Sequence, residues 1–386
     1  MHKPDFTGTS LVNLMGTLLD AMGGVANGYP LLTGLDSESI KDSRNIVLFV
    51  IDGLGYDYLT KAGSGSTLHQ HLRAKLTSVF PSTTASAITT FMTGLAPQQH
   101  GLTGWHVYLK ELGCVTAVLP FRPRLPNASF AQDGCDVRRL YDCEPLFNRI
   151  DRSSYVIAPE LIIHSEYNVA HSGSAFLHAY DTMSGCFNNI ANIIKSDDAK
   201  KYLYAYWPDF DRYSHEFGNA SAKVISHFEQ LDEMFTSLLT ELEGTETTVL
   251  VTADHGFTDT EASSLIQLHD HPVMQDALLL PLCGEPRVAY CYIHPGKEAQ
   301  FVNYVQDELG TYAELMPSQA LIDGEFFGSG PMHSQLHNRI GHYALLMKEN
   351  YIIKDWLLGE SSYVPIGVHG GMSQEEMFVP FVVIEK

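Results

Sequence analysis

Cysteine pairs are missing from this sequence. Its six cysteines are scattered and include no Cys-x-x-Cys pair; they are Cys114, Cys135, Cys143, Cys186, Cys283 and Cys291. This spacing disfavours both a zinc–thiolate knuckle and a disulfide framework. We therefore expect the cysteines to be free thiols, buried as small apolar side chains.

Positive charge is also scarce. The chain has 24 lysines and arginines against 45 aspartates and glutamates, and its formal net charge is −21 at pH 7. A field of this sign repels phosphates, so it disfavours a nucleic-acid duplex or an anionic membrane as the main partner. A small anionic substrate would need metal ions or a local basic pocket to offset the field.

Long apolar runs are absent too. No run approaches the roughly 20 residues that span a bilayer, and the start of the chain, Met1-His2-Lys3-Pro4-Asp5-Phe6, lacks the basic-then-apolar pattern of a signal peptide. We expect a cytoplasmic protein without a membrane partner, while export by a route without an N-terminal signal stays open. The sequence leaves the oligomeric state open.

Strand and helix patterns alternate along the chain, which has 386 residues and is long enough for a large core. The continuous apolar runs that predict buried strands are 45–51, 202–207, 247–252 and 378–384. Helical patterns cover 10–22, 182–194 and 222–242. Such alternation predicts an α/β fold with a mostly parallel central sheet, flanked by helices on both faces.

The sequence pattern of residues 257–365 differs from that of the rest of the chain, and this span separates one core strand from the last. We predict that residues 1–256 and 366–386 form a catalytic core and that 257–365 form an inserted cap subdomain. Ligands of open parallel sheets bind beyond the carboxyl ends of the strands, where such an insertion can act as a lid.

A hydroxyl-rich stretch, residues 77–94, places Ser82, Thr83 and Thr84 between Pro81 and a run with helical spacing. The free N–H groups and positive dipole end of a helix N-terminus favour a phosphate or an alkoxide. Such residues more often serve as an ordinary N-cap. Taken by itself, the stretch favours the cap.

Carboxylates and histidines flank the predicted strands at one edge of the sheet. They are Asp52 after 45–51, Asp211 and His215 after 202–207, Asp254 and His255 after 247–252, and His369 before 378–384. The four-residue spacing of Asp211 and His215 places both on one face of a helix. Oxygen and imidazole donors suit two borderline divalent ions such as zinc. Paired metal ions commonly stabilise a phosphoryl group during its transfer.

Together these segments resemble the alkaline phosphatase superfamily, and within it the type I phosphodiesterase/nucleotide pyrophosphatase family. The motifs that carry the resemblance are Val50-Ile51-Asp52-Gly53, Phe80-Pro81-Ser82-Thr83-Thr84, Thr93-Gly94-Leu95-Ala96-Pro97-Gln98-Gln99-His100-Gly101, Asp211-x-x-x-His215, Ala253-Asp254-His255-Gly256 and His369-Gly370-Gly371. They keep the family's order from residue 46 to the end of the sequence. The ordered set is specific, whereas no single motif is.

The resemblance implies an alkaline phosphatase-like fold and a site with two zinc ions, for which Mn²⁺ is the alternative. One ion would be bound by Asp52, Asp254 and His255 together with Thr84; the other would be bound by Asp211, His215 and His369. The implied nucleophile is Thr84, with Thr83 as the alternative. The implied reaction is hydrolysis of a small-molecule phosphodiester, nucleotides included, through a covalent phospho-threonine intermediate.

Two departures from the family pattern bear on the substrate. Nucleotide-cleaving relatives carry an asparagine three residues after the nucleophile, where this chain has Ala87, and no arginine accompanies Thr84. The missing arginine favours diesters over monoesters, and the substrate-binding residues stay unknown. A phosphomonoesterase or phosphosugar mutase of the same superfamily, and a non-catalytic metal-binding homologue, remain as alternatives. For Trp105 and Tyr108, which follow the nucleophile helix, we predict packing roles.

Overall fold

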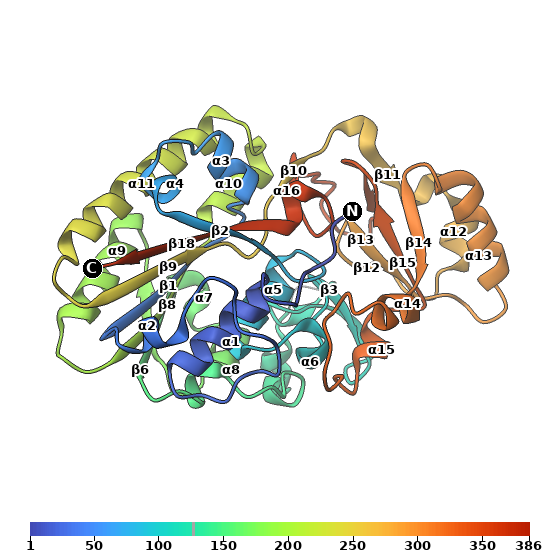
Figure 1. Cartoon of the computed structure of the whole chain (residues 1–386). Helices are drawn as coiled ribbons and strands as arrows, with labels where there is room; N and C mark the ends of the chain where they lie inside the picture. The colour runs from blue at the N-terminus through green and yellow to red at the C-terminus, as the bar shows by residue number, and fades with distance from the viewer. Residues whose placement is uncertain (126–127) are drawn as a thin grey trace.

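The computed structural model describes residues 1–125 and 128–386, and these form two seven-stranded sheets that lie side by side (Figure 1). The central strand of the larger sheet, β1 (Asn45–Ile51), is buried along its whole length and pairs in parallel with β8 and β9. The strands of this sheet are, in spatial order, β2 (Leu72–Thr77), β18 (Phe378–Glu385), β9 (Thr247–Thr252), β1, β8 (Lys201–Trp207), β6 (Ser153–Pro159) and β7 (Phe176–Tyr180). The predicted mostly parallel sheet is confirmed.

The last strand runs the other way. β18 is antiparallel to both of its neighbours, β9 and β2, although its apolar run was expected to be a buried parallel strand like the others. An apolar run reports burial on both faces but not direction. Direction follows from the connection, because Phe378 pairs with Thr77, the last residue of β2, and β18 therefore starts at the edge where the parallel strands end.

Helices cover both faces of this sheet, as expected (Figure 1). On one face lies α11 (Ala222–Glu241) with α9 (Met183–Lys195), and on the other lies α1 (Leu11–Ala21) with α5 (Thr84–Thr93). The Ser10 hydroxyl accepts a hydrogen bond from the Asn13 backbone N–H in a capping box, which fixes the start of α1 as the sequence predicts. None of the helices in the described part of the chain combines the length and apolar character that crossing a bilayer requires.

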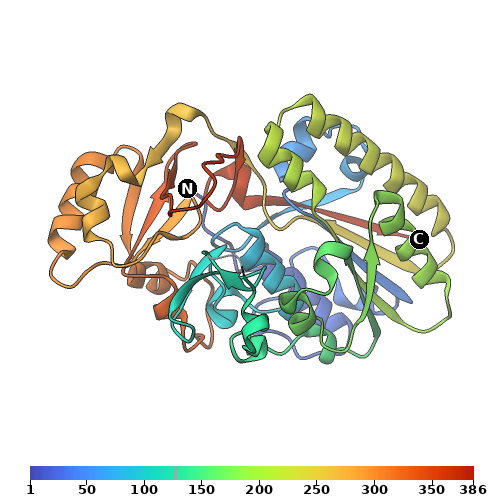
Figure 2. The same ribbon diagram turned by 180° about the vertical axis from the view of Figure 1, so that it is seen from behind.

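The second sheet draws strands from two parts of the chain. Residues 257–365 supply β14 (Ala313–Pro317), β15 (Tyr343–Met347), β13 (Val288–Cys291) and β12 (Cys283–Gly284), and residues 106–123 extend the sheet with β3 (His106–Leu109), β4 (Cys114–Ala117) and β5 (Arg122–Pro123). Figure 2 shows the blue-green strands beside the orange ones. The sheet has a core of its own, formed with α12 (Pro272–Ala277) and α13 (Glu298–Tyr304). The boundary between core and cap stays a prediction.

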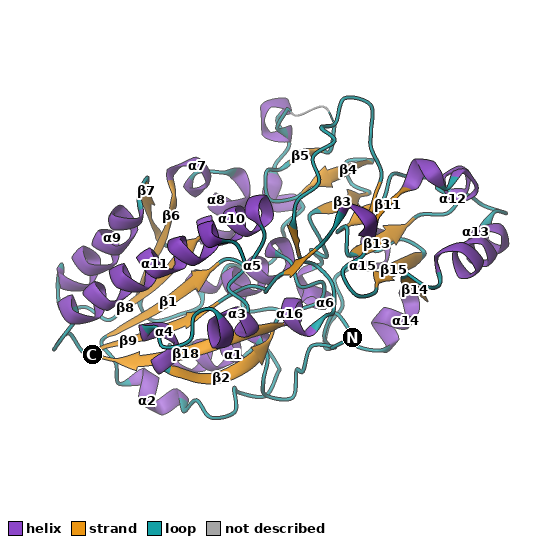
Figure 3. Ribbon diagram, turned by 90° about the horizontal axis from the view of Figure 1, so that it is seen from above, coloured by secondary structure: helices purple, strands orange, loops and turns teal. Residues whose placement is uncertain are grey.

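The segment after β2 runs between the two sheets. Seen from above, α5 begins in the space that separates them (Figure 3). The hydroxyl-rich stretch therefore lies where the carboxyl edge of the larger sheet faces the second sheet.

The six cysteines are free, and Cys186, Cys283 and Cys291 among them are buried.

Candidate active site

The hydroxyl-rich turn joins β2 to α5. Thr83 occupies the N-cap position of α5, yet its side chain makes no capping hydrogen bond. The Thr83 hydroxyl donates instead to Glu285 Oε1 at 2.6 Å, and the Ser82 hydroxyl donates to the Gly371 carbonyl at 2.7 Å. Thr84 Oγ1 lies 3.2 Å from His255 Nε2. The interpretation of this stretch as an ordinary N-cap is wrong, because tertiary partners take all three hydroxyls.

The start of α5 leaves backbone donors free beside Thr84. The first hydrogen bond of the helix runs from the Ala87 N–H to the Thr83 carbonyl at 3.0 Å. The N–H groups of Thr84, Ala85 and Ser86 therefore have no partner within the helix, and the positive end of the helix dipole lies with them. This end of α5 is suited to an oxyanion bound at Thr84.

One group of metal-ligand side chains follows β1 and β9. His255 Nε2 lies 3.3 Å from Asp52 Oδ1 and 3.4 Å from Asp254 Oδ2, and all three side chains are buried. Asp52 Oδ2 accepts a hydrogen bond from the Tyr206 hydroxyl, while Asp254 Oδ1 accepts the backbone N–H groups of Gly53 and His255 at 3.0 Å. The carboxylate oxygens that face His255 are left without donors among the described residues.

A second group stands on α10 (Asp209–Phe217) and on the segment before β18. Asp211 Oδ1 lies 3.4 Å from His215 Nε2 and 3.8 Å from His369 Nε2. The two groups touch, since the His255 and His369 rings stack at 3.7 Å between centroids. Donor atoms of Asp211, His255 and His369 also fall within 4.8 Å of one another. Which of these side chains serves which ion therefore stays a prediction.

Each imidazole of the cluster is oriented by a backbone carbonyl. The Nδ1 atoms of His215, His255 and His369 bond the carbonyls of Gly367, Gly256 and Ser82 at 2.8, 3.1 and 3.3 Å. A proton on Nδ1 leaves the Nε2 lone pair directed at the carboxylates, which is the arrangement found in metal ligands. Buried carboxylate oxygens without donors are costly unless a cation satisfies them. The donor set thus fits two divalent ions of the zinc class.

Burial and like charge dominate the electrostatics of the cluster. Burial, with the neighbouring charges of Asp211 and Asp254, raises the pKa of Asp52 well above its usual range, and burial also raises the pKa of Asp211. Burial and the nearby His255 and His215 hold the pKa of His369 well below its usual range. The protein alone disfavours the ionised forms of Asp52 and Asp211, and bound cations would stabilise them.

Two cavities meet at Thr84. A cavity of about 820 Å³ opens on the core side and is rich in aromatic side chains, among them Tyr167, Tyr180, Tyr204, Tyr206 and Trp207. A cavity of about 440 Å³ opens on the cap side, where His106, Arg124, Glu285, Lys354 and Asp355 are among its lining residues. Thr84, Trp105 and Asp211 line both. A substrate held at Thr84 can therefore extend in two directions.

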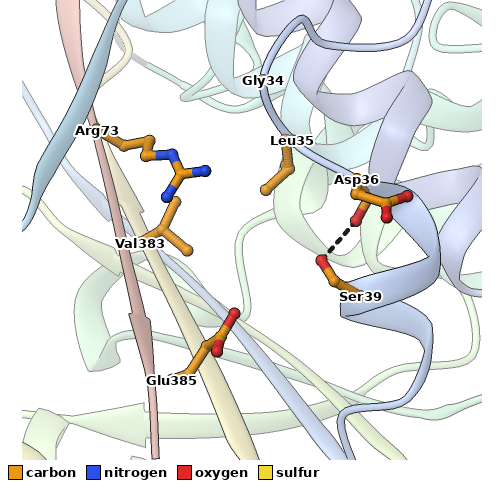
Figure 4. Close-up of a pocket in the computed structure, with 7 residues that line it drawn as sticks. All are labelled: Gly34, Leu35, Asp36, Ser39, Arg73, Val383 and Glu385. Atoms are coloured by element: carbon orange, nitrogen blue, oxygen red, sulfur yellow. Dashed lines mark hydrogen bonds between the residues drawn. The ribbon is translucent and has the colours of Figure 1, made fainter.

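A third cavity lies at the opposite edge of the larger sheet. It is about 430 Å³ in volume, and Arg73 of β2, Val383 and Glu385 of β18 and the loop before α2 (Ser37–Lys41) line it (Figure 4). Ser39 donates a hydrogen bond to the Asp36 carbonyl at its rim. None of the predicted site residues lines this cavity, so it has no part in the candidate active site.

Some side chains of the site were missed or misjudged from the sequence. For Trp105 a packing role was predicted, but its side chain is 36% exposed and lines both cavities. Tyr108 does pack, edge-on against Tyr292. Ala87 is buried within α5 and lines neither of the two cavities. Glu285 carries no local sequence signal, because only the fold brings it to Thr83.

The sheet order and the flanking helices match the alkaline phosphatase-like fold of several solved structures. Similar solved structures include murine ectonucleotide pyrophosphatase/phosphodiesterase 5, with a TM-score of 0.66 and 17% identity over 88% of this chain and 87% of that one. An inactive threonine-to-alanine variant of that murine protein, in complex with AMP, matches equally well. Phosphonoacetate hydrolase from Sinorhizobium meliloti, in complex with phosphonoformate, has a TM-score of 0.61 and 18% identity over 88% and 90% of the chains.

The sequence itself identifies the family. The model of the type I phosphodiesterase/nucleotide pyrophosphatase family matches residues 46–372. The chain therefore belongs to this family of phosphoester hydrolases, as the ordered motifs indicate. A comparison with curated proteins finds no significant match.

Proposed function

We propose that this protein is a two-metal phosphodiesterase in which Thr84 is the nucleophile. The observation that supports the proposal most is the position of Thr84, at the N-terminus of α5, beside the buried carboxylate and histidine cluster and at the meeting point of two cavities. A phosphoryl group held there would meet a hydroxyl, free backbone donors and the metal ligands together. The inactive threonine-to-alanine variant of the murine relative supports a threonine as the reacting residue.

The proposed reaction has two displacements at phosphorus. Thr84 Oγ1 gives up its proton and attacks phosphorus in line, the bond to the leaving oxygen breaks, and one substituent departs as an alcohol or phenol that takes up a proton. The phosphoryl group, which still carries the other substituent, stays on Thr84 as a phospho-threonine ester. Water then attacks the same phosphorus and frees the threonine with release of a phosphomonoester. The N–H groups at the start of α5 donate to the non-bridging oxygens as negative charge develops on them.

The metal ions would be zinc, with manganese as the alternative. Asp52, Asp254 and His255 with Thr84 would hold one ion, and Asp211, His215 and His369 would hold the other. Bound zinc would lower the pKa of the threonine hydroxyl and neutralise charge on the transferring group. Tyr206 fixes Asp52 by donating to its Oδ2, and the carbonyl partners of the three imidazoles fix their rings.

The two cavities support a diester as the substrate. A phosphodiester has two organic substituents, and one can enter each cavity, whereas a monoester fills only one. The larger cavity is lined by flat aromatic side chains and suits an aryl group or a nucleobase. The AMP complex of the murine relative supports a nucleotide as one candidate.

A comparison of two synthetic substrates tests the proposal. With zinc-replete enzyme, we expect kcat/KM for bis(p-nitrophenyl) phosphate to exceed that for p-nitrophenyl phosphate by at least about tenfold, because the second aryl group adds binding in the other cavity. A preference for the monoester would contradict the proposal and favour the phosphomonoesterase or mutase alternative. No turnover of any phosphoester by a metal-replete sample would favour a non-catalytic homologue.

A further inference from the structure

Glu285 is a buried carboxylate of the cap that reaches the nucleophile turn of the core. It lies in the tight turn between β12 and β13, where its backbone N–H donates to the Val288 carbonyl at 2.8 Å. Its Oε1 accepts the Thr83 hydroxyl at 2.6 Å and the Trp105 backbone N–H at 2.7 Å. The side chain thus connects the residue before Thr84 to the tryptophan that both cavities share.

The turn that carries Glu285 is fixed to the core on its other side. Arg287 donates two hydrogen bonds to Glu376, at 3.0 and 2.8 Å, and both side chains are almost completely buried. Glu376 also accepts the backbone N–H of Gly371, two residues after His369. Gly370 packs so closely on Glu285 that an added Cβ would lie 2.8 Å from the glutamate side chain. Glu285 is therefore held in one place beside the site.

Burial raises the pKa of the Glu285 carboxyl to about 7, so the group is mostly ionised only above neutral pH, and its charge then has no cationic partner among the described residues. Within the described residues it forms no ion pair, and its Oε2 makes no hydrogen bond. Both cations of the cap-side cavity have partners elsewhere: Arg124 contacts Asp355 and Glu360 at 2.8 and 2.7 Å, and Lys354 donates to the Tyr363 carbonyl and lies over the Trp356 ring. Glu285 lines this cavity together with Thr84, Asp211 and His369.

We infer that Glu285 is a specificity-determining residue that selects diesters against monoesters. Above neutral pH, at about pH 8, a phosphomonoester carries close to two negative charges, whereas a diester carries one. At that pH, a fixed carboxylate without an ion-pair partner, in the cavity that Thr84 also lines, repels the additional charge more than it affects the diester. The inference rests on the proposed phosphodiesterase function and names what discriminates between its two substrate classes.

The Glu285→Gln variant tests this inference, because its amide oxygen can still accept from Thr83 and Trp105 while the charge is lost. At about pH 8, where Glu285 is mostly ionised, we expect kcat/KM for p-nitrophenyl phosphate to rise relative to that for bis(p-nitrophenyl) phosphate by about tenfold, the scale of a single charge interaction near a protein surface. Glu314→Gln, which removes the same charge from an exposed position of β14 outside both cavities, should leave the ratio unchanged.

The ratio of the two kcat/KM values distinguishes a role of Glu285 in substrate selection from a purely structural role. If Glu285 were only a structural link, Glu285→Gln would change both activities together and leave the ratio constant, which would overturn the inference while the diester preference of the wild type still upheld the proposed function. A wild type inert on both substrates would instead overturn the proposed function.

A second measurement needs no variant. In the wild-type enzyme at pH 8, a monoanionic phosphonate ester should inhibit more strongly than the dianionic phosphonate with the same aryl group. Equal inhibition, or tighter binding of the dianion, would overturn the role of Glu285 even if the Gln variant fails to fold.

Discussion

Hydrolysis of bis(p-nitrophenyl) phosphate is expected to fall by at least about 10³-fold when Thr84 is replaced with alanine, because the reaction loses its nucleophile. The zinc content should stay at the wild-type level, since the other donors of the cluster come from β1, β9, α10 and the segment before β18. Steady-state kinetics on the purified variant, with elemental analysis of the same sample, measures both.

Two further variants distinguish Thr84 from its neighbour. Thr84→Ser keeps a hydroxyl at the same position and should retain measurable turnover, with a phosphoserine trapped in place of phospho-threonine. Thr83→Val removes only the hydrogen bond to Glu285 and should cost far less than Thr84→Ala. Wild-type turnover in Thr84→Ala would contradict the assignment of Thr84 as the nucleophile. If Thr83→Val lost its turnover while Thr84→Ala kept it, Thr83 would be the nucleophile instead.

Removing divalent ions with a chelator is expected to abolish activity and to lower the melting temperature. An ion that binds only the folded protein, at a free concentration about a thousandfold above its dissociation constant, stabilises the protein by about 4 kcal/mol. Without them, buried carboxylate oxygens of Asp52, Asp211 and Asp254 are left without partners. Thermal unfolding with and without chelator, followed by re-addition of Zn²⁺ or Mn²⁺, measures the effect.

A single ligand substitution sharpens this experiment. Asp254→Asn weakens the group at the end of β9, so the variant should bind fewer than two ions and lose most of the stabilisation by zinc. Asp270→Asn removes a carboxylate from an exposed position and serves as the matched control. An unchanged melting temperature after chelation of the wild type, with full activity, would mean that the cluster works without metal.

Patterns read locally predict much of this fold. The apolar runs of β1 and β9 and the capped start of α1 are visible in the sequence because burial and capping act over a few residues. The carboxylate and histidine cluster is predictable for a related reason. Asp52, Asp254 and His255 closely follow β1 and β9, and the helix that carries Asp211 and His215 follows β8. Parallel strands bring their carboxyl ends to one edge.

What could not be predicted depends on contacts between distant segments. Glu285 reaches Thr83 across 202 positions of sequence, and nothing around either residue signals the contact. Trp105 has a large aromatic side chain of the kind that usually packs, but it lies where two cavities meet. β18 reads as a strand, yet its antiparallel direction follows from where the preceding segment enters the sheet.

The position of β18 also sets when the site can form during synthesis. β2, which leads into the turn with Thr84, has β18 as its sheet neighbour, and β18 is made after every other strand of that sheet. His369 is likewise made late, just before it. A nascent chain on the ribosome therefore holds the ligands after β1, β8 and β9 long before the nucleophile turn has a strand to dock on. The chemistry that we propose at Thr84 must wait until the ribosome has made β18.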